Sequence, residues 1–323
     1  RESMNTYYVL SEGFDPRENL ALEGYIINNC RSDEVWLYLW QNRNTVVIGR
    51  NQNPWRECNM EAIRRDGVTL VRRSSGGGAV FHDDGNLNFT FIAPKELYDL
   101  EKQLSVVLRA LESFGLHAEF SGRNDILLDG RKFSGNAFSH SHGISMQHGT
   151  LLIKTDMTRL AKYLSPSKLK LNAKGVTSVR SRVCNLSDAC ADITPQTLCG
   201  ALVEAFQKIY APLTASIKSG EIDKNDYREL IDKYSSWEWI MGQTPQFEAV
   251  YEHRFDWGEV QLCYNVRGGL VESARLFSDA MDAELIMRAQ AALAGKRATA
   301  QALSEAVRDI SPALADWIAS LPV

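Results

Sequence analysis

Apolar and polar side chains alternate along residues 86–93, where Leu87, Phe89 and Phe91 fall on one face of an extended chain. Side chains of a strand point alternately to its two faces, so this period of two predicts a strand. Shorter β-rich runs predict further strands at Thr6–Leu10, Val35–Trp40, Thr45–Ile48, Val68–Val71, Ala79–Phe81 and Met146–Ile153. We expect the two runs on either side of residues 41–44 to pair as a hairpin.

Helix starts are marked by capping residues. Asp15 precedes Pro16, and Thr194 precedes Pro195. The cap side chain accepts a backbone N–H, and proline is already shaped for the first helical position. Helices are expected at Pro16–Cys30, Pro54–Arg65, Lys95–Phe114, Thr194–Tyr210 and Lys224–Tyr234. Within the first of these, the segment Asn19–Glu23 is interpreted as core packing.

The pattern changes near residue 246. Three β-rich runs predict a meander, and three helices are predicted after it: Phe247–Phe255, Glu259–Val266 and Leu270–Phe277, then Ala283–Ala294, Thr299–Val307 and Leu314–Leu321. We therefore expect a catalytic domain at 4–246 and a small α+β accessory domain at 247–323. Because hairpins and helices are interspersed in the first part, the fold class is predicted as α/β (α+β), with a mixed, mostly antiparallel sheet.

Composition narrows the functional classes. The 323 residues are 44% hydrophobic and 24% charged, as is typical of globular proteins. A formal net charge of −4 gives no overall basic field, so binding to nucleic acid is not expected. No apolar run approaches the ~20 residues that span a bilayer and no signal-peptide pattern occurs, so no membrane association is expected. Six scattered cysteines without a C-x-x-C pair are typical of a reducing cytoplasm, where we expect the protein.

Three consecutive glycines, Gly76–Gly78, follow the sequence Arg72-Arg73-Ser74-Ser75. Glycine lets backbone N–H groups come close to a ligand, and two guanidinium groups offer paired donors suited to phosphate or carboxylate. The spacing matches neither a Walker A loop nor a dinucleotide-binding fingerprint. The segment is therefore interpreted as an anion-binding loop of another kind. A glycine-rich hairpin turn beside solvated arginines is the alternative.

Candidate ligand-binding side chains lie on the strands that follow. Asp129-Gly130 is a strong signal for a two-residue hairpin turn, which places Lys132 on a strand. That lysine is either a ligand contact or a solvated surface group. Asn124-Asp125 could hydrogen-bond a sugar, hold a metal ion or cap a turn. His148, which precedes a glycine, could contact a ligand or serve in packing.

Residues 157–186 contain seven lysines and arginines but no acidic side chain. Such a run is usually a solvated face. Because it also contains proline, glycine and several serines, we interpret part of it as a long loop that acts as a lid. Nucleic-acid binding is the other interpretation, and the lack of interleaved aromatic residues disfavours it.

Together these motifs resemble those of bacterial lipoate-protein ligases of the biotin/lipoate ligase family. The matching segments are Thr45–Pro54, Arg72–Asp83, Gly122–Asp125, Lys132–Gly135, His148–Leu152, Lys174–Arg180 and Ser235–Trp239. They occur in order and cover nearly the whole chain. The resemblance implies a catalytic domain related in fold to class II aminoacyl-tRNA synthetases. It also implies a small C-terminal accessory domain, where the pattern changes.

The resemblance implies a two-step chemistry. The carboxylate of free lipoate, or of octanoate, attacks the α-phosphorus of ATP to give lipoyl-AMP and pyrophosphate, while Mg²⁺ neutralises the triphosphate. The amine of a lysine on a lipoyl carrier domain then takes the acyl group and releases AMP. The implied carriers are acyltransferase subunits of 2-oxo-acid dehydrogenases and the glycine-cleavage H protein. A monomer is the default expectation for such an enzyme.

By the same resemblance, individual residues are assigned roles. Lys132 is expected to be catalytic, bridging the lipoate carboxylate and a phosphate oxygen. Nucleotide contacts are expected from Arg73, Gly77, Gly78, Ala79, Val80, Phe81, Asn124, Asp125 and Lys132. Lipoate contacts are expected from Arg72, Ser74, Gly76, Lys132, His148 and Gly149, with Val71, Val80 and Phe89 lining an apolar slot. Asp125 is the candidate Mg²⁺ ligand, and Lys174 is the expected lid contact.

Two other functions stay open. An acyltransferase of the same fold would take octanoyl from acyl carrier protein on a cysteine without ATP, and Cys184 is the candidate nucleophile. No histidine or lysine is recognisably paired with it. A lipoate-binding module without turnover is the non-enzymatic alternative. The intact set of Arg73, Gly76–Gly78 and Lys132 argues against that module.

Overall fold

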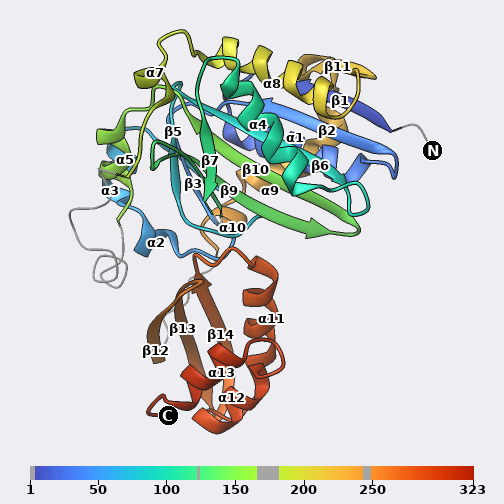
Figure 1. Cartoon of the computed structure of the whole chain (residues 1–323). Coiled ribbons are helices and arrows are strands. Elements are labelled where there is room, and N and C mark those ends of the chain that lie inside the picture. The colour runs from blue at the N-terminus through green and yellow to red at the C-terminus, as the bar shows by residue number, and fades with distance from the viewer. Residues whose placement is uncertain (1–3, 122–123, 166–181, 243–248) are drawn as a thin grey trace.

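The computed structural model describes residues 4–121, 124–165, 182–242 and 249–323, and its largest feature is an eight-stranded sheet (Figure 1). The strand order is β11 (Ala215–Lys218), β1 (Asn5–Leu10), β2 (Glu34–Trp40), β6 (Asn86–Pro94), β10 (Ile144–Leu152), β9 (Arg131–Ser141), β8 (Asp125–Leu128) and β7 (Ala118–Ser121). β1 is parallel to β11 and β2, and the remaining pairs are antiparallel. The predicted mixed, mostly antiparallel sheet is therefore confirmed.

A second sheet of three strands packs against the first. β3 (Thr45–Ile48) lies between β4 (Thr69–Arg72), to which it is parallel, and β5 (Val80–His82), to which it is antiparallel. The hairpin predicted around residues 41–44 is therefore wrong, because β2 pairs with β1 and β6 instead. Both runs are almost entirely buried. A strand that is apolar on both faces carries little local information about its neighbour.

The described helices of residues 4–242 are α1 (Pro16–Asn29), α2 (Pro54–Glu57), α3 (Met60–Arg65), α4 (Leu100–Glu112), α5 (Met157–Tyr163), α7 (Leu186–Ala189), α8 (Pro195–Ile209), α9 (Arg228–Ser235) and α10 (Trp237–Ile240), with 3₁₀ turns η1 (Ser219–Glu221) and η2 (Lys224–Tyr227). α1 and α8 begin at the predicted caps, Asp15 and Thr194. The single helix predicted over Pro54–Arg65 is wrong. Asn59 caps α3, and Cys58 is extended and bridges Leu164.

Two other predicted helices differ at their starts. α4 begins at Leu100, because the Asp99 side chain caps it by accepting the Lys102 N–H. The helix predicted from Lys224 starts as the 3₁₀ turn η2 and becomes α-helical at Arg228. Within the described ranges, no helix has the length and apolar character needed to cross a membrane.

Helices cover both faces of the large sheet. On one face, α4 and α8 pack against Leu37, Phe89 and Phe133. On the other face, α1, α9 and the small sheet pack against Tyr38 and Met146. β6 lies between these two layers and is buried along its whole length. Its side chains therefore point alternately into two buried cores, one on each side of the sheet.

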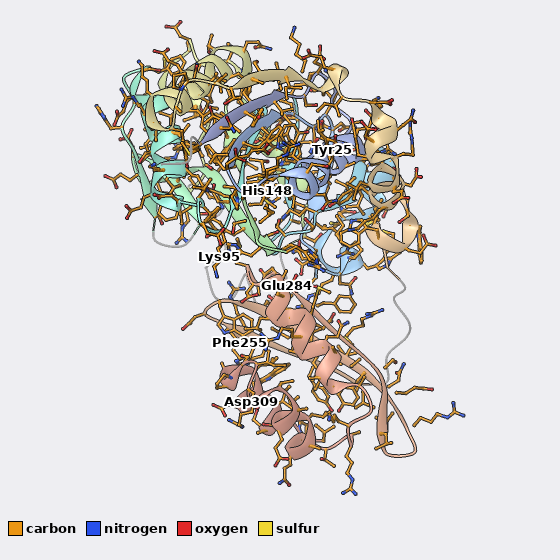
Figure 2. All side chains as sticks on the ribbon, turned by 90° about the vertical axis from the view of Figure 1, so that its right-hand side faces the viewer. Tyr25, Lys95, His148, Phe255, Glu284 and Asp309 are labelled. Carbon is orange, nitrogen blue, oxygen red and sulfur yellow. The ribbon has the colours of Figure 1, made fainter. Side chains whose placement is uncertain are left out.

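The C-terminal domain (residues 249–323) has its own core. It consists of β12 (Ala249–Phe255), β13 (Gly258–Arg267), β14 (Leu270–Ser278), α11 (Ala283–Leu293), α12 (Ala300–Val307) and α13 (Pro312–Ala319). Val260, Ile286 and Leu314 belong to its separate buried cluster. The predicted meander and helices are confirmed, while the boundary at residue 246 falls outside the described residues. In Figures 1 and 2 the domain lies beneath the large sheet, with Glu284 near the junction.

Candidate active site

A cavity lies between the two sheets, lined by residues from α1, β2, β3, β5, β6, β9, β10 and the glycine loop, together with Asn124 and Met281. Its charged end comprises Arg73, Gly77, Gly78, Asn124 and Lys132. Its apolar end comprises Leu20, Trp40, Val47, Val80 and His82. Trp40 is on β2 and Lys132 on β9, with two strands between them in the sheet. The cavity therefore extends across several strands.

Most residues assigned from the sequence line this cavity. They are Arg73, Gly77, Gly78, Ala79, Val80, Asn124, Lys132, His148 and Gly149. Those that do not line it are Arg72, Ser74, Gly76, Phe81 and Asp125. Phe81 points away because it alternates with Val80 and His82 on β5, and it packs in a separate core with Tyr163. Lys174 lies outside the described residues.

The apolar slot is built from other residues than those expected. Val80 lines it, but Val71 and Phe89 are buried in the cores on either side of the sheet. Leu20 and Trp40 line it without having been predicted. Leu20 belongs to a helix segment that was interpreted as core packing alone.

Arg72 has a structural role where a lipoate contact was expected. Its guanidinium donates to the carbonyl oxygens of Gly49, Arg50, Gln52, Trp239 and Ile240 at 2.7–3.2 Å. The Trp239 indole N–H donates in return to Arg72 O at 2.7 Å. Since these carbonyls occupy its donors, Arg72 joins the chain before α2 to α10. This side chain is 7% exposed.

The glycine loop surrounds the side chain of Arg73, the next residue, and its carbonyl oxygens accept hydrogen bonds from the guanidinium. Arg73 Nη2 donates to Gly76 O at 2.7 Å and to Gly78 O at 2.8 Å, and its Nε donates to Ser75 Oγ at 3.1 Å. Gly77 has φ 97°, a backbone conformation that favours glycine. Burial lowers the pKa of Arg73 to about 10, so the guanidinium stays charged at neutral pH.

Lys132 reaches the charged end from β9. Asp129 and Gly130 have φ 50° and 75°, which confirms the two-residue turn that starts this strand. Lys132 Nζ forms an ion pair with Asp125 Oδ1 at 2.8 Å. A Cβ at Gly135 would lie 3.1 Å from Nζ, so glycine leaves room for the ammonium group. The Lys132 N–H donates to Arg182 O at 2.6 Å, which holds the strand in place.

A buried polar chain connects the two ends of the cavity. Ser75 Oγ lies 2.6 Å from His148 Nε2, and His148 Nδ1 lies 3.1 Å from the Glu23 carboxylate. Thr90 Oγ1 donates to Glu23 at 2.7 Å and accepts from the Trp40 indole at 2.9 Å. Sequence reasoning missed Glu23. The available signal was a polar pair, Asn19 and Glu23, spaced i, i+4 on the buried face of α1.

The C-terminal domain also contributes to the charged end. Gly77 N donates to Ala280 O at 2.9 Å, and Asn124 Nδ2 lies 3.7 Å from Met281 Sδ. Met281 lines the cavity. Gly76 explains the close docking, because a Cβ there would come within 2.4 Å of the carbonyl oxygens of Ala280 and Met281. No chemistry was assigned to this part of the chain from its sequence.

Comparison with protein families accounts for this architecture. Residues 15–207, more than half of the chain, match the lipoyl protein ligase A/B catalytic domain. Residues 244–318 match the C-terminus of bacterial lipoate protein ligases. The chain belongs to the lipoate-protein ligase family.

Solved structures of lipoate-protein ligases are similar to this chain in sequence and in fold. The chain is 30% identical to LipL1 of P. falciparum, solved with lipoate, covering 97% of this chain and 99% of that one with a TM-score of 0.86. It is 27% identical to a lipoate-protein ligase A solved with ATP, covering 74% and 99% with a TM-score of 0.65. It is also 27% identical to part of a bi-partite lipoate protein ligase from Thermoplasma acidophilum, described with its E2 lipoyl domain, covering 77% and 100% with a TM-score of 0.66.

Cys184, the candidate nucleophile of a transferase, does not line the cavity, although its backbone N–H donates to Lys132 O at 2.9 Å. It is 8% exposed, packs in the core beneath α8, and its Sγ donates to Arg131 O at 3.5 Å. Burial raises the pKa of its thiol, which disfavours the thiolate.

The described residues contain no cluster of three His, Cys, Asp or Glu side chains arranged to hold a metal ion. Asp125 stands beside Lys132 as a single carboxylate. Mg²⁺ typically binds proteins through one or two carboxylates together with substrate phosphates. The donor set therefore fits an ion that arrives with a nucleotide, and does not fit a resident metal.

Proposed function

We propose that the protein activates free lipoate with ATP to form lipoyl-AMP and then transfers the lipoyl group to a lysine of a carrier domain. The observation that carries this proposal is the cavity itself. Lys132, Arg73 and the glycine loop lie at one end, and apolar side chains form the other. Relatives solved with lipoate and with ATP support the same two substrates. We also propose that residues 4–246 form the catalytic domain and 247–323 the accessory domain.

The charged end suits the activation step. A carboxylate and a triphosphate repel each other, so positive groups and N–H donors must converge where charge develops in the transition state. We assign the Lys132 ammonium to this role, between the lipoate carboxylate and a phosphate oxygen. Asn124 and the backbone of Gly77–Val80 are assigned to the nucleotide. Asp125 is the carboxylate that would share Mg²⁺ with the triphosphate, and bound Mg²⁺ would neutralise phosphate charge.

The apolar end suits the acyl chain. The four chain methylenes of lipoate, at ~0.8 kcal/mol each, contribute about 3 kcal/mol when buried. Leu20, Trp40, Val47 and Val80 supply the surface. Lipoate then lies with its carboxylate toward Lys132 and its ring toward Trp40. His148 and Gly149 line the wall between them.

Transfer follows from the same geometry. A mixed anhydride hydrolyses unless water is excluded, so the adenylate must be covered until a carrier lysine arrives. The proposed acceptors are lipoyl domains of 2-oxo-acid dehydrogenases and the H protein, and a lipoyl domain accompanies the Thermoplasma relative. Lys174 stays the proposed lid contact on sequence grounds.

Exchange of labelled pyrophosphate into ATP tests the proposal. A ligase of this kind exchanges label only when lipoate is present, and Cys184→Ser retains that exchange. A transferase would show no exchange and would lose octanoyl transfer from acyl carrier protein in Cys184→Ser. A lipoate-binding module would bind lipoate in calorimetry with neither activity. The transferase result or the binding-module result would overturn the assignment of ligase activity.

A further inference from the structure

His82, at the apolar end, holds a buried polar atom that the proposed chemistry does not use. The residue is 4% exposed and lines the cavity, and its Nε2 has no hydrogen-bond partner among the residues that the structure describes. Buried polar groups are nearly always paired, so an unpaired one beside a cavity points to a ligand. Whether Nε2 donates or accepts decides which ligand chemistry it fits.

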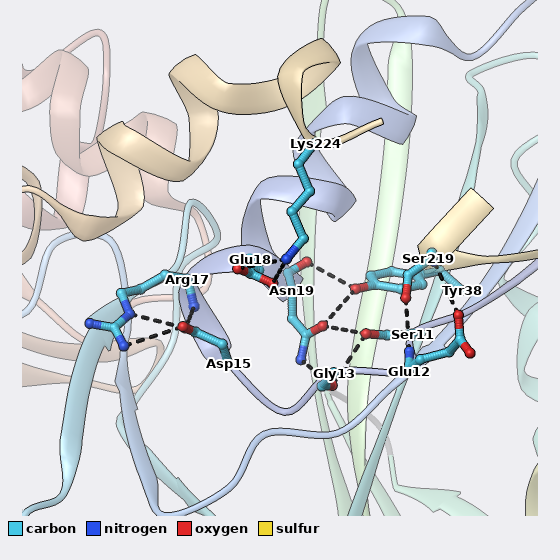
Figure 3. A network of polar contacts seen from close by, with 11 residues as sticks. Ser11, Glu12, Gly13, Asp15, Arg17, Glu18, Asn19, Tyr38, Ser219 and Lys224 are labelled. Atoms are coloured by element: carbon cyan, nitrogen blue, oxygen red, sulfur yellow. Dashed lines mark hydrogen bonds and ion pairs between the residues drawn. The ribbon is translucent and has the colours of Figure 1, made fainter. Parts of the chain in front are cut away.

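The proton on this ring can be located by starting from a backbone carbonyl. The Asn19 side chain lies 2.8 Å from Gln41 O, and because a carbonyl only accepts, the atom facing it is Asn19 Nδ2. Asn19 Oδ1, on the other side, accepts from the hydroxyl groups of Ser11 and Tyr38 (Figure 3). The orientation of the Asn19 amide is therefore determined.

The orientation of the Asn42 amide follows from that of Asn19, and it determines which ring nitrogen of His82 accepts. Asn19 Nδ2 donates to Asn42 Oδ1 at 3.0 Å, so the amide nitrogen of Asn42 faces His82 Nδ1 at 3.1 Å. His82 Nδ1 therefore accepts, and the neutral ring carries its proton on Nε2. Burial, with Arg73 and His148 nearby, lowers the pKa of His82 to about 3, which keeps the ring neutral. Nε2–H is thus an unused donor at the cavity.

This donor lies away from Lys132, although Arg73 of the charged end is near enough to influence the His82 ring. His82 Nδ1 lies 3.5 Å from the Asn88 side chain on β6, whereas Lys132 is on β9, and β10 runs between these two strands. Neighbouring strands are about 4.8 Å apart, so β6 and β9 are separated by roughly 10 Å. An acid whose carboxylate lies at Lys132 therefore extends its distal end toward His82.

We propose that His82 is a specificity-determining residue whose Nε2–H donates to a sulfur at the distal end of the acyl substrate. This inference rests on the proposed function and names its substrate class. Acids that end in a dithiolane ring are preferred over acids that end in an alkyl chain, such as octanoate. Sulfur is a weak acceptor. An alkyl end, however, leaves the buried N–H unpaired, which is unfavourable for a desolvated donor.

The test compares two substitutions of similar length. His82→Met removes the donor, whereas His82→Gln keeps an amide N–H at similar reach. For each variant, kcat/KM is measured with lipoate and with octanoate in the full-length enzyme. We expect the lipoate-to-octanoate ratio to fall roughly 3- to 10-fold in His82→Met, the net value of one hydrogen bond, and to recover in His82→Gln. An unchanged ratio in a folded His82→Met enzyme would mean that Nε2 bonds water, and would overturn the inference.

A direct readout covers the case in which the variants fold poorly. Nitrogen-15 NMR of the histidine-labelled wild-type protein should show a neutral ring protonated at Nε2, and the Nε2–H resonance should shift with lipoate and stay in place with octanoate. Equal shifts with both acids would refute sulfur recognition. This measurement and calorimetric binding of the two acids need no turnover. If exchange activity were absent while the preference held, the proposed function would fail and the role of His82 would stand.

Discussion

The two ends of the cavity are built differently. The apolar end is formed by residues of the two sheets and α1, and the polar chain of Glu23, His148 and Ser75 already satisfies the groups along its wall. The charged end is shared with the C-terminal domain. There Gly77 N donates to Ala280 O, and Lys132 pairs with Asp125.

The apolar end is therefore a preorganised surface, whereas the charged end must exchange internal contacts for contacts with a ligand. Among the residues that the structure describes, the buried polar side chains at the apolar end already have partners apart from His82 Nε2, so a ligand meets little ordering cost there. At the charged end, the Gly77 N–H and the Lys132 ammonium are held by internal partners. A nucleotide that uses these groups must replace Ala280 O and compete with Asp125. Substitutions at the charged end should therefore act on turnover, and those at the apolar end on stability and substrate choice.

The largest expected effect is at Lys132. Lys132→Ala removes the ammonium that we place between carboxylate and phosphate, so lipoate-dependent pyrophosphate exchange should fall by about 100-fold or more. Lys95→Ala is the matched control, since Lys95 is an exposed lysine outside the cavity (Figure 2). Near-normal exchange in Lys132→Ala would show that the Lys132 ammonium is not needed for the activation step.

The second effect concerns the polar chain. Glu23→Leu leaves His148 and Thr90 buried without their shared acceptor, and breaking such a pair should cost about 3 kcal/mol of unfolding free energy in urea. Glu18→Leu, on the same helix, loses an exposed ion pair with Lys224 (Figure 3) and should cost less than about 1 kcal/mol. Equal losses would show that the chain does not stabilise the apolar end.

The third effect is a pH dependence at His82. Its pKa is about 3 in the folded protein and 6.5 in an unfolded chain, so below pH 6.5 the unfolded state binds a proton that the folded state does not. Stability should therefore fall with falling pH by about 1.4 kcal/mol per pH unit from this group. Between pH 7 and pH 5, the wild type should lose about 2 kcal/mol more than His82→Met. Parallel curves would show that the ring is charged or exposed.

The smallest effect concerns domain docking. Gly76→Ala places a Cβ against the carbonyl oxygens of Ala280 and Met281, and such overpacking costs about 1–3 kcal/mol. The C-terminal domain should therefore dock less tightly, and small-angle scattering should record a larger radius of gyration. Gly78→Ala is the control, because a Cβ there meets nothing within 4 Å. An unchanged radius in Gly76→Ala would mean that docking does not depend on this contact.

Sequence reasoning located the cavity better than it assigned the individual contacts. The arginine pair was recognised, but only Arg73 lines the cavity, while Arg72 binds backbone carbonyls. Both are consistent with an anion-binding motif, and neighbouring side chains leave an extended chain on opposite sides. Met281 had no local signal, because its place in the cavity comes from the docking of a separate domain. The local signal for Glu23 was weak and consisted of its i, i+4 spacing from Asn19.

The sequence by itself determined the local elements of this protein: the caps at Asp15 and Thr194, the turn at Asp129-Gly130, and the C-terminal meander. These depend on hydrogen bonds and side-chain periods within a few residues. Only the tertiary structure decided that β2 and β3 belong to different sheets, that Arg73 faces the cavity, and that Met281 completes it. Those outcomes depend on which segments, far apart in the chain, exclude water from one another.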